Sequence, residues 1–367
     1  MGYFGRLFYL ALLGILFSIP STAANYPAPK EGDFIARDFH FDDGEKLPEL
    51  RLHYATLGTP VRNANGVITN AVLLLESTSS SWKQFTSAQF GDVLFGPGQL
   101  LDATTHFIIM SDAIGNGGSS KPSNGLKGHF PHYDSHDRVV GQHRLLTEAL
   151  GINHLSLVLG TSGGCMEAWV WGETYPDFMD ALMPVACLPV EIGGRNRVIR
   201  HLIIDSIRSD PAWNNGDYTK EPLQGLHGAY SYLMIATGSA LQWQKKYPTR
   251  ELADKFADDF IQERLTSMDA NDLLYSLEAA RDYDPSSNLE KIKAFVMHVN
   301  TADDLMDPPE LGIAEREIKR VPHGKFVLIP TSEQTRGHLT HTMAEIWKPY
   351  LQQLLEEAKA PSSGGQK

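Results

Sequence analysis

The sequence predicts an α/β fold in which a mostly parallel central sheet is flanked by helices, with an inserted helical cap. Three observations support this prediction. Short, continuous apolar runs such as residues 71–75 have the length and composition of strands that are buried on both faces. Segments with helical spacing separate these runs, and such alternation is typical of a parallel sheet. Residues 188–290 lose the aliphatic strand runs and look helical instead.

The expected elements follow one another along the chain after an extended leader at residues 25–33. Residues 50–57 alternate in polarity, which indicates an edge strand. The other strands are expected at residues 71–75, 106–110, 155–159, 181–187, 294–299 and 326–329. The helices are expected at residues 137–150, 166–175, 250–268, 271–281 and 342–358.

These elements define the expected domain organisation. A core is formed by residues 25–187 and 291–360, and the cap is inserted at residues 188–290. The last residues, 361–367, are expected to form a disordered tail. No internal repeat is present in the sequence.

The first 24 residues predict a secretory signal peptide. Arg6 supplies a positive start, residues 7–19 are mostly apolar, and residues 21–24 are small, as a cleavage site requires. An uncleaved membrane anchor is the alternative, but the apolar run is short for a membrane span. We therefore expect a secreted or periplasmic protein that has no stable membrane insertion after cleavage of residues 1–24.

Charge and composition exclude some partners. The chain has 367 residues and a formal net charge of −12, and cleavage of the signal peptide would remove one arginine and no acid. An acidic chain without a large cluster of lysine and arginine is not expected to bind nucleic acid. The sequence also lacks the Cys/His spacing of a zinc site, so no metal is predicted.

The two cysteines, Cys165 and Cys187, allow two interpretations. An exported protein could join them in a disulfide, because one follows the serine motif described next and the other ends the following strand. Two buried free thiols are the simpler interpretation, and the sequence slightly favours them.

The most informative motif is Gly-x-Ser-x-Gly at residues 160–164, with Ser162 at its centre. It lies between an expected strand and an expected helix, so Ser162 would sit on a sharp turn with its hydroxyl exposed. Small flanking residues allow the strand and the helix to pack closely there. This arrangement is the nucleophile elbow of the α/β-hydrolase fold, which predicts acyl-transfer chemistry at Ser162.

A serine hydroxyl needs a base to accept its proton, and in this fold the base follows the last strand. Four histidines follow the cap. His298 lies within a strand and His323 precedes the last strand. His341 is expected in the first turn of the final helix. His338 follows the last strand after a short loop in which Gly337 supplies backbone freedom, so we assign the base to His338.

The acid that orients the base should follow the strand at residues 294–299. Three aspartates compete there. Asp307 is furthest from the strand and precedes a proline, so we interpret it as a turn or cap residue. Asp303 and Asp304 are adjacent, and the residues alone leave the choice between them open.

Two backbone N–H groups are needed to stabilise the oxyanion of the tetrahedral intermediate. Gly163, directly after the serine, is expected to supply one. The polar loop at residues 76–81, after the third strand, is expected to supply the other, although it contains no glycine.

Taken together, these residues resemble the homoserine O-acetyltransferase branch of the α/β-hydrolase superfamily, over roughly residues 40–355. The resemblance implies that Asp304, four residues before a Pro-Pro pair, is the acid. It also implies that Thr78 is the second oxyanion donor, with Ser77 as the alternative, and that the cap holds a homodimer interface. The matching segments are residues 94–98, 111–120, 175–177, 304–310 and 337–338.

The chain also departs from that family. Gly163 and Cys165 replace a methionine and a glycine at the elbow. The resemblance implies an arginine in the cap and an aspartate after the histidine to hold homoserine, and this chain has Ile204 and Leu339 instead. An unpaired buried charge is costly, so a zwitterionic substrate is disfavoured.

We therefore predict an exported serine hydrolase, similar to an esterase, that acts on a small-molecule acyl substrate and needs no cofactor. Ser162, Asp304 and His338 are the expected triad. Acyl transfer to an unknown alcohol is the first alternative, since hydrolysis and transfer use the same triad. A non-catalytic binding protein on this fold is the second.

Overall fold

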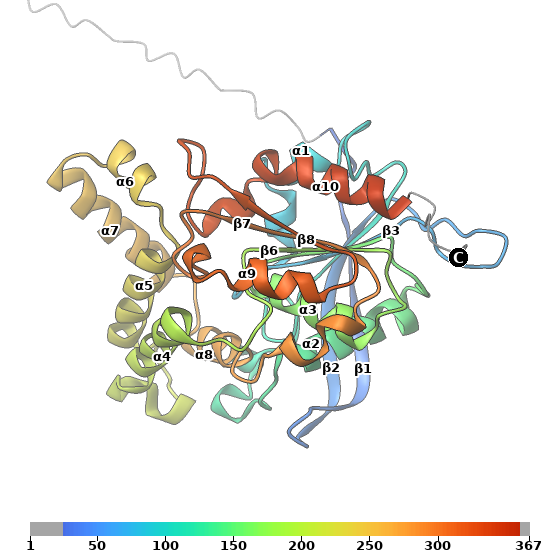
Figure 1. Cartoon of the computed structure of the whole chain (residues 1–367). Helices are drawn as coiled ribbons and strands as arrows, with labels where there is room; N and C mark the ends of the chain where they lie inside the picture. Colours follow the sequence, from blue (N-terminus) through green and yellow to red (C-terminus); the bar gives the residue numbers. More distant parts are fainter. Residues whose placement is uncertain (1–24, 360–367) are drawn as a thin grey trace, which may run out of the picture.

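The computed structural model describes residues 25–359; the predicted signal peptide (1–24) and tail (361–367) lie outside them. An eight-stranded sheet with the order β1-β2-β4-β3-β5-β6-β7-β8 forms its centre (Figure 1). β2 runs antiparallel to both of its neighbours, β1 and β4, and the other neighbouring strands pair in parallel. The strands are β1 (Lys30–His40), β2 (Lys46–Leu57), β3 (Ala71–Leu75), β4 (Phe107–Ser111), β5 (Leu157–Thr161), β6 (Ala181–Val185), β7 (Phe295–Thr301) and β8 (Gly324–Ile329).

Helices cover both faces of this sheet (Figure 1). Every residue of β3, β4, β5 and β6 is buried, as expected for parallel strands between two helical layers. The predicted α/β fold class is therefore confirmed. The helices are α1 (Gly91–Leu94), α2 (Ser135–Arg144), α3 (Gly163–Thr174), α4 (Gly194–Arg208), α5 (Leu223–Thr237), α6 (Ala240–Lys246), α7 (Arg250–Leu265), α8 (Ala270–Glu278), α9 (Ile313–Glu317) and α10 (Ala344–Lys359).

A separate apolar core lies on each side of the sheet. On one side α2 and α3 pack on the central strands, and the indole rings of Trp169 and Trp171 are completely buried. On the other side α1 and α10 pack together, and Trp347 is completely buried against Phe90. The central strands are thus held between two packed layers, and these layers fix the position of their carboxyl ends.

The prediction of an edge strand at residues 50–57 is wrong, because β2 is the second strand and β1 lies outside it. The predicted leader at residues 25–33 is wrong for residues 30–33, because these residues form the start of β1. Only Ala36 and Phe39 of β1 are buried, so its sequence lacks an apolar pattern. The other six predicted strands lie within two residues of the observed bounds.

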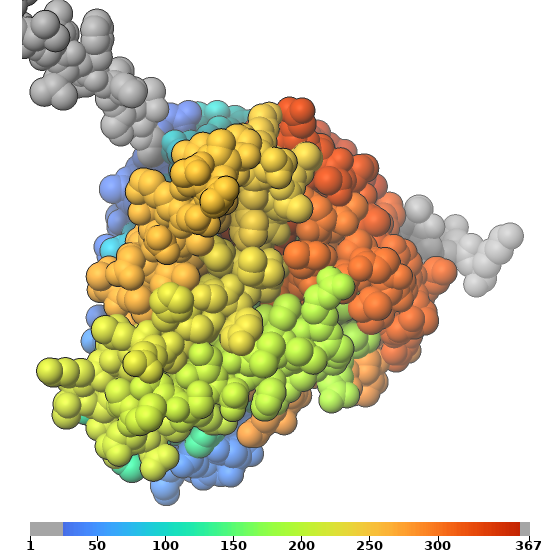
Figure 2. Space-filling model, turned by 90° about the vertical axis from the view of Figure 1, so that its left-hand side faces the viewer, coloured from blue at the N-terminus to red at the C-terminus, as the bar shows by residue number. Residues whose placement is uncertain are grey.

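Residues 188–290 contain α4 to α8 and no strand. These helices lie to one side of the sheet in Figure 1, and Figure 2 shows them spread over that face, next to the segments near residues 300–340. Within this group α5 packs on both α4 and α7, and α8 packs on α4. Among residues 25–359, no helix combines the length and the apolar composition that a membrane span requires.

The preference for two free thiols is wrong: Cys165 and Cys187 form a disulfide. Cys165 is in the first turn of α3, and Cys187 follows β6, the strand next to β5 in the sheet. Neighbouring parallel strands bring these two positions to a Cα–Cα distance of 5.9 Å, which suits a disulfide. The bridge therefore ties the start of α3 to the segment that leaves β6.

We expect removal of this bridge to lower stability, because the disulfide closes a loop with a sequence separation of 22. Loop-closure entropy of that size corresponds to ~3 kcal/mol. Chemical unfolding of the protein made in an oxidising compartment, compared with Cys165→Ala/Cys187→Ala, measures the difference.

A reductant is the matched control, since it should destabilise the wild type and leave the double variant unchanged. Alkylation of the denatured, unreduced protein should find neither thiol free. Two alkylated thiols per chain would contradict the assignment.

Candidate active site

Ser162 lies on the turn between β5 and α3 with a strained backbone, at φ 53° and ψ −111°. Such a conformation is rare for a residue other than glycine and is typical of functional sites. Very close packing holds the turn. A Cβ atom on Gly160 would overlap the carbonyl oxygen of Gly164, and a Cβ atom on Gly164 would overlap the carbonyl oxygen of Leu75. The predicted elbow geometry around Ser162 is present.

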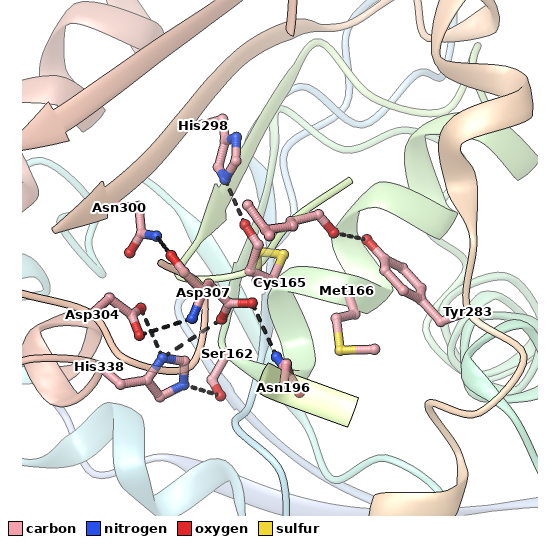
Figure 3. Close-up of a disulfide and its surroundings, with 12 residues drawn as sticks. Ser162, Cys165, Met166, Asn196, Tyr283, His298, Asn300, Asp304, Asp307 and His338 are labelled. Atoms are coloured by element: carbon pink, nitrogen blue, oxygen red, sulfur yellow. Dashed lines mark hydrogen bonds and ion pairs between the residues drawn. A yellow bond between two sulfur atoms is a disulfide. The ribbon is translucent and has the colours of Figure 1, made fainter. Parts of the chain in front are cut away.

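The imidazole of His338 lies against the serine hydroxyl. His338 follows β8, and Gly337 before it has a φ of +61°, a conformation that favours glycine. The Nε2 atom of His338 is 2.8 Å from the Oγ atom of Ser162 (Figure 3). This is hydrogen-bond distance for a proton transfer between the two groups.

Asp304, which follows β7, completes a hydrogen-bonded row. Its Oδ2 atom is 2.9 Å from Nδ1 of His338, and its Oδ1 atom accepts hydrogen bonds from the N–H groups of Met306 and Asp307. The structure thus brings together Ser162, His338 and Asp304, the three residues expected from the sequence.

Asp303 points to a different place. Its Oδ2 atom accepts hydrogen bonds from the hydroxyl groups of Ser239 and Thr335 and from the N–H of Gly337. Asp303 therefore fastens the loop that holds His338, while its neighbour contacts the imidazole.

The row is buried, and its electrostatics fit a base and its partner. Burial alone would raise the pKa of Asp304, but the charge of His338 and the hydrogen bonds to this carboxylate bring the pKa below its usual value. Burial would lower the pKa of His338, yet the charge and hydrogen bond of Asp304 raise it above 6.5. Each group therefore stabilises the charged form of the other.

The remaining late histidines lie elsewhere in the structure. His298 is buried in β7 with Nε2 2.8 Å from the carbonyl oxygen of Cys187, and burial lowers its pKa to about 4. His323 stacks on Phe295. His341 contacts the ring of His338 edge to face, and burial lowers its pKa to about 3. None of these three faces the serine hydroxyl.

The loop after β3 lies beside the elbow. A Cβ atom built on Gly163 would be 2.8 Å from the backbone nitrogen of Thr78, so the two backbones meet next to Ser162. The N–H of Gly163, at the start of α3, has no acceptor within its helix. Among residues 25–359, no hydrogen bond of the Thr78 N–H is present either. Both donors expected from the sequence are thus close to the serine.

Buried polar contacts hold this loop in place. The Oε1 atom of Glu76 accepts hydrogen bonds from the N–H of Ala113 and the side chain of Asn116. Burial, together with the charges of Glu167 and Asp112, raises the pKa of Glu76 to about 8.

Ser162 and His338 open into a cavity of about 190 Å³ that lies between the core and α4. This volume is below the ~300–1,000 Å³ that pockets for drug-sized ligands occupy, so a small group fits it best. Met166, Ala186 and Met306 line it near the serine, and α4 contributes Asn196 and Arg200.

Ile204 and Leu339 do not line this cavity. Ile204 is buried in an apolar cluster that joins α4, α5 and α8 to β1 and β2, and Leu339 is 42% exposed. The structure therefore places an apolar group at both positions where the resemblance implies contacts to homoserine.

Asp307 lies in the bend before Pro308, as expected of a turn residue, but its side chain also faces the site. Its side chain is buried, it lines the cavity, and one of its oxygens is 3.8 Å from Nδ1 of His338. The sequence signal was its spacing, three residues after Asp304, but the Pro-Pro pair that follows suggested a turn.

The residues described by the structure include three groups of acids and histidines whose donor atoms lie close together. Two of them include exposed acids, which are common without an ion. The third consists of Asp304, Asp307 and His338, and the hydrogen bond between Asp304 and His338 explains its closeness. We assign no metal ion to any of these groups.

Comparison with known proteins gives consistent relatives, although no family model matches the chain. The chain is 31% identical to a homoserine O-acetyltransferase of Haemophilus influenzae over 300 residues, 73% of this chain and 82% of the relative. It is 30% identical to a probable acyltransferase of Methanothermobacter thermautotrophicus over 307 residues, 83% of this chain and 91% of the relative. It is 28% identical to an ethyl acetate hydrolase of Pseudomonas veronii over 332 residues, 83% of this chain and 92% of the relative.

Solved structures share the fold. The acetyl esterase MekB superposes with a TM-score of 0.77 at 25% identity, over 90% of this chain and 98% of that one. A homoserine O-acetyltransferase from Bacillus anthracis superposes equally well, with a TM-score of 0.77 at 20% identity, over 92% of this chain and 100% of that one.

The fold and these relatives define an α/β-hydrolase enzyme that hydrolyses esters or transfers acyl groups. Within that class, the chain belongs to the homoserine O-acetyltransferase-like branch, which includes acyltransferases and esterases.

We expect Gly164→Ala to disrupt the elbow, because a Cβ atom there would overlap the carbonyl oxygens of Leu75 and Glu76. Overpacking of this kind costs roughly 1–3 kcal/mol. Gly193→Ala is the matched control, since a Cβ atom there meets no other atom within 4 Å. Denaturant unfolding of both variants measures the difference. Equal midpoints for the two variants would contradict the close approach.

Proposed function

We propose that the protein is an exported serine esterase that uses Ser162, His338 and Asp304 and forms an acyl-enzyme. The observation that supports it most is the hydrogen-bonded row from Ser162 through His338 to Asp304 at the wall of a cavity. The predicted signal peptide at residues 1–24 and the disulfide Cys165–Cys187 support export, because disulfides persist in oxidising compartments.

In the proposed reaction, the Oγ atom of Ser162 attacks the acyl carbon and its proton moves to Nε2 of His338. Asp304 holds the imidazole through Nδ1 and stabilises its positive charge. The N–H groups of Gly163 and Thr78 stabilise the oxyanion. The bond to the alcohol then breaks, and His338 gives its proton to the leaving oxygen.

Water resolves the acyl-enzyme by the reverse sequence of proton transfers. His338 accepts a proton from the water as its oxygen attacks the acyl carbon, and the bond to Ser162 breaks. The carboxylic acid leaves, and Ser162 regains its proton from His338. No cofactor takes part in these steps, since the serine itself forms the covalent intermediate.

We propose short-chain esters as the substrates. The cavity is small, and relatives of similar length are named ethyl acetate hydrolase and acetyl esterase. The resemblance gives no support for homoserine, because the two positions at which it implies charged contacts hold the apolar Ile204 and Leu339, and neither residue lines the cavity.

Transfer of the acyl group to another alcohol is the second candidate. It is favoured by the relatives named acyltransferase, which would use the same first half-reaction. Product analysis with a short-chain ester, with and without added alcohols, distinguishes the two. Complete hydrolysis that no alcohol diverts would exclude transfer.

We expect Ser162→Ala to abolish hydrolysis of p-nitrophenyl acetate and labelling by a fluorophosphonate probe, because the variant has no nucleophile. The kcat loss should be at least about 10³-fold. An intact, folded wild type that neither reacts with the probe nor hydrolyses any ester of the panel would sink the proposal and favour a binding protein.

We expect Asp304→Asn to lower kcat by ~10³–10⁴-fold, because the amide cannot stabilise the imidazolium. Asp303→Asn is its matched neighbour and should cost far less, since an amide oxygen can still accept the hydrogen bonds of Ser239, Thr335 and Gly337. Equal losses in the two variants would contradict the assignment of Asp304.

The pH dependence should follow the raised pKa of His338. The base must be neutral to accept the serine proton, so kcat/KM should fall as the pH drops through a value above 6.5. Asp304 raises this pKa, and the residual activity of Asp304→Asn should therefore fall off at a lower pH. An acid limb at the same pH in the wild type and in Asp304→Asn would contradict this electrostatic picture.

A further inference from the structure

The side chain of Asp307 lies next to the imidazole of His338, a placement that a role in the turn alone does not require. Its side chain is buried, and its Oδ2 atom is 3.8 Å from Nδ1 of His338, beside the hydrogen bond that Asp304 makes (Figure 3). Two carboxylates therefore flank the same nitrogen of the imidazole.

The cap holds the other oxygen of this carboxylate. The side-chain amide of Asn196, in α4, donates a hydrogen bond of 3.1 Å to Oδ1 of Asp307. The oxygen of that amide accepts a hydrogen bond of 2.8 Å from Nε of the buried Arg200. A continuous polar row thus runs from the cap to the imidazole.

The backbone of Asp307 is held as well. Its N–H donates to Asp304, and its carbonyl oxygen accepts a hydrogen bond of 2.8 Å from Asn300. With both backbone groups and one carboxylate oxygen bonded, the second oxygen has a defined position next to His338.

Two adjacent buried carboxylates repel one another, so this arrangement has a cost unless a positive charge lies between them. The charged or titratable groups that act on Asp307 are Asp304, His338, Arg200 and Tyr283, and His341 packs on the far side of the imidazole. The imidazolium that forms when His338 accepts a proton is the group that both carboxylates can stabilise.

We propose that Asp307 is a second carboxylate partner of His338, a positioning residue through which the cap residue Asn196 supports the base. The inference rests on the proposed serine chemistry. Burial and the charge of Asp304 raise the pKa of Asp307 to about 7, so its charge changes near neutral pH. Support of the imidazolium should then grow as the pH rises through that value.

Asp307→Asn is the direct test, because the amide resembles the neutral acid. We expect kcat for p-nitrophenyl acetate to fall roughly three- to tenfold at pH 8.5, with a smaller change in KM, and the loss to shrink towards pH 6. A purely structural role would give a loss that does not change with pH. Thermal unfolding shows whether the variant remains folded.

Two further variants sharpen the test. Asn196→Ala removes a hydrogen bond that favours the ionised form of Asp307. Compared with the wild type, the variant should therefore gain activity only at a higher pH. In the Asp304→Asn background, loss of Asp307 should cost more than it does alone, since Asp307 is then the only carboxylate beside His338. Glu310→Gln, an exposed acid on the same segment, is the matched control and should leave the profile unchanged.

The outcomes separate this inference from the function itself. A pH-independent loss in Asp307→Asn, or no loss at all, together with full Ser162-dependent activity in the wild type would overturn the role of Asp307 alone. An inactive wild type that fluorophosphonate does not label would overturn the serine chemistry instead. Titration of His338 by NMR adds a readout without substrate, in which Asp307→Asn should lower its pKa.

Discussion

The close crossing of β5, α3 and the loop after β3 is the constraint on which the rest of the site depends. At this crossing the backbones of Gly160, Gly164 and Leu75 approach so closely that no side chain fits between them. The turn is thereby forced into a backbone conformation that presents the hydroxyl of Ser162 outward. At the same place the backbone of Thr78 comes close to Gly163. The positions of Ser162 and of the two proposed oxyanion donors thus depend on one packing contact.

The remaining partners reach this point from the carboxyl ends of neighbouring strands. β7 delivers Asp304 and β8 delivers His338, and these strands are adjacent in the sheet. In open α/β sheets this edge is where functional groups converge. Burial then makes the contacts strong, since Asp304 and His338 each stabilise the charged form of the other where water cannot screen them. Asp303 adds a mechanical role by tying the His338 loop to Ser239 of the cap.

The features that could be predicted are those that a short stretch of sequence determines by itself. Ser162 and the buried strands have short, strong patterns, and the chain order of the fold points to His338. β1 was missed because its residues are mostly exposed and its stability comes from pairing with β2. The disulfide and the burial of Asp307 depend on which segments become neighbours in space. The choice between Asp303 and Asp304 required family resemblance, because adjacent residues differ only in the direction of their side chains.

The wall of the cavity contains the proposed nucleophile and base as well as the residues that surround a bound substrate. The bridge from Cys165 to Cys187 ties the start of α3 to the segment after β6, which also lines the cavity. Opposite this wall, Asn196 and Arg200 come from α4 of the cap, and their row of hydrogen bonds ends at Asp307 beside the imidazole. In the proposed mechanism, a change in α4 would therefore act on His338 without contact with the substrate. Cap residues in this chain would then influence both which acyl group binds and how strongly His338 acts as a base.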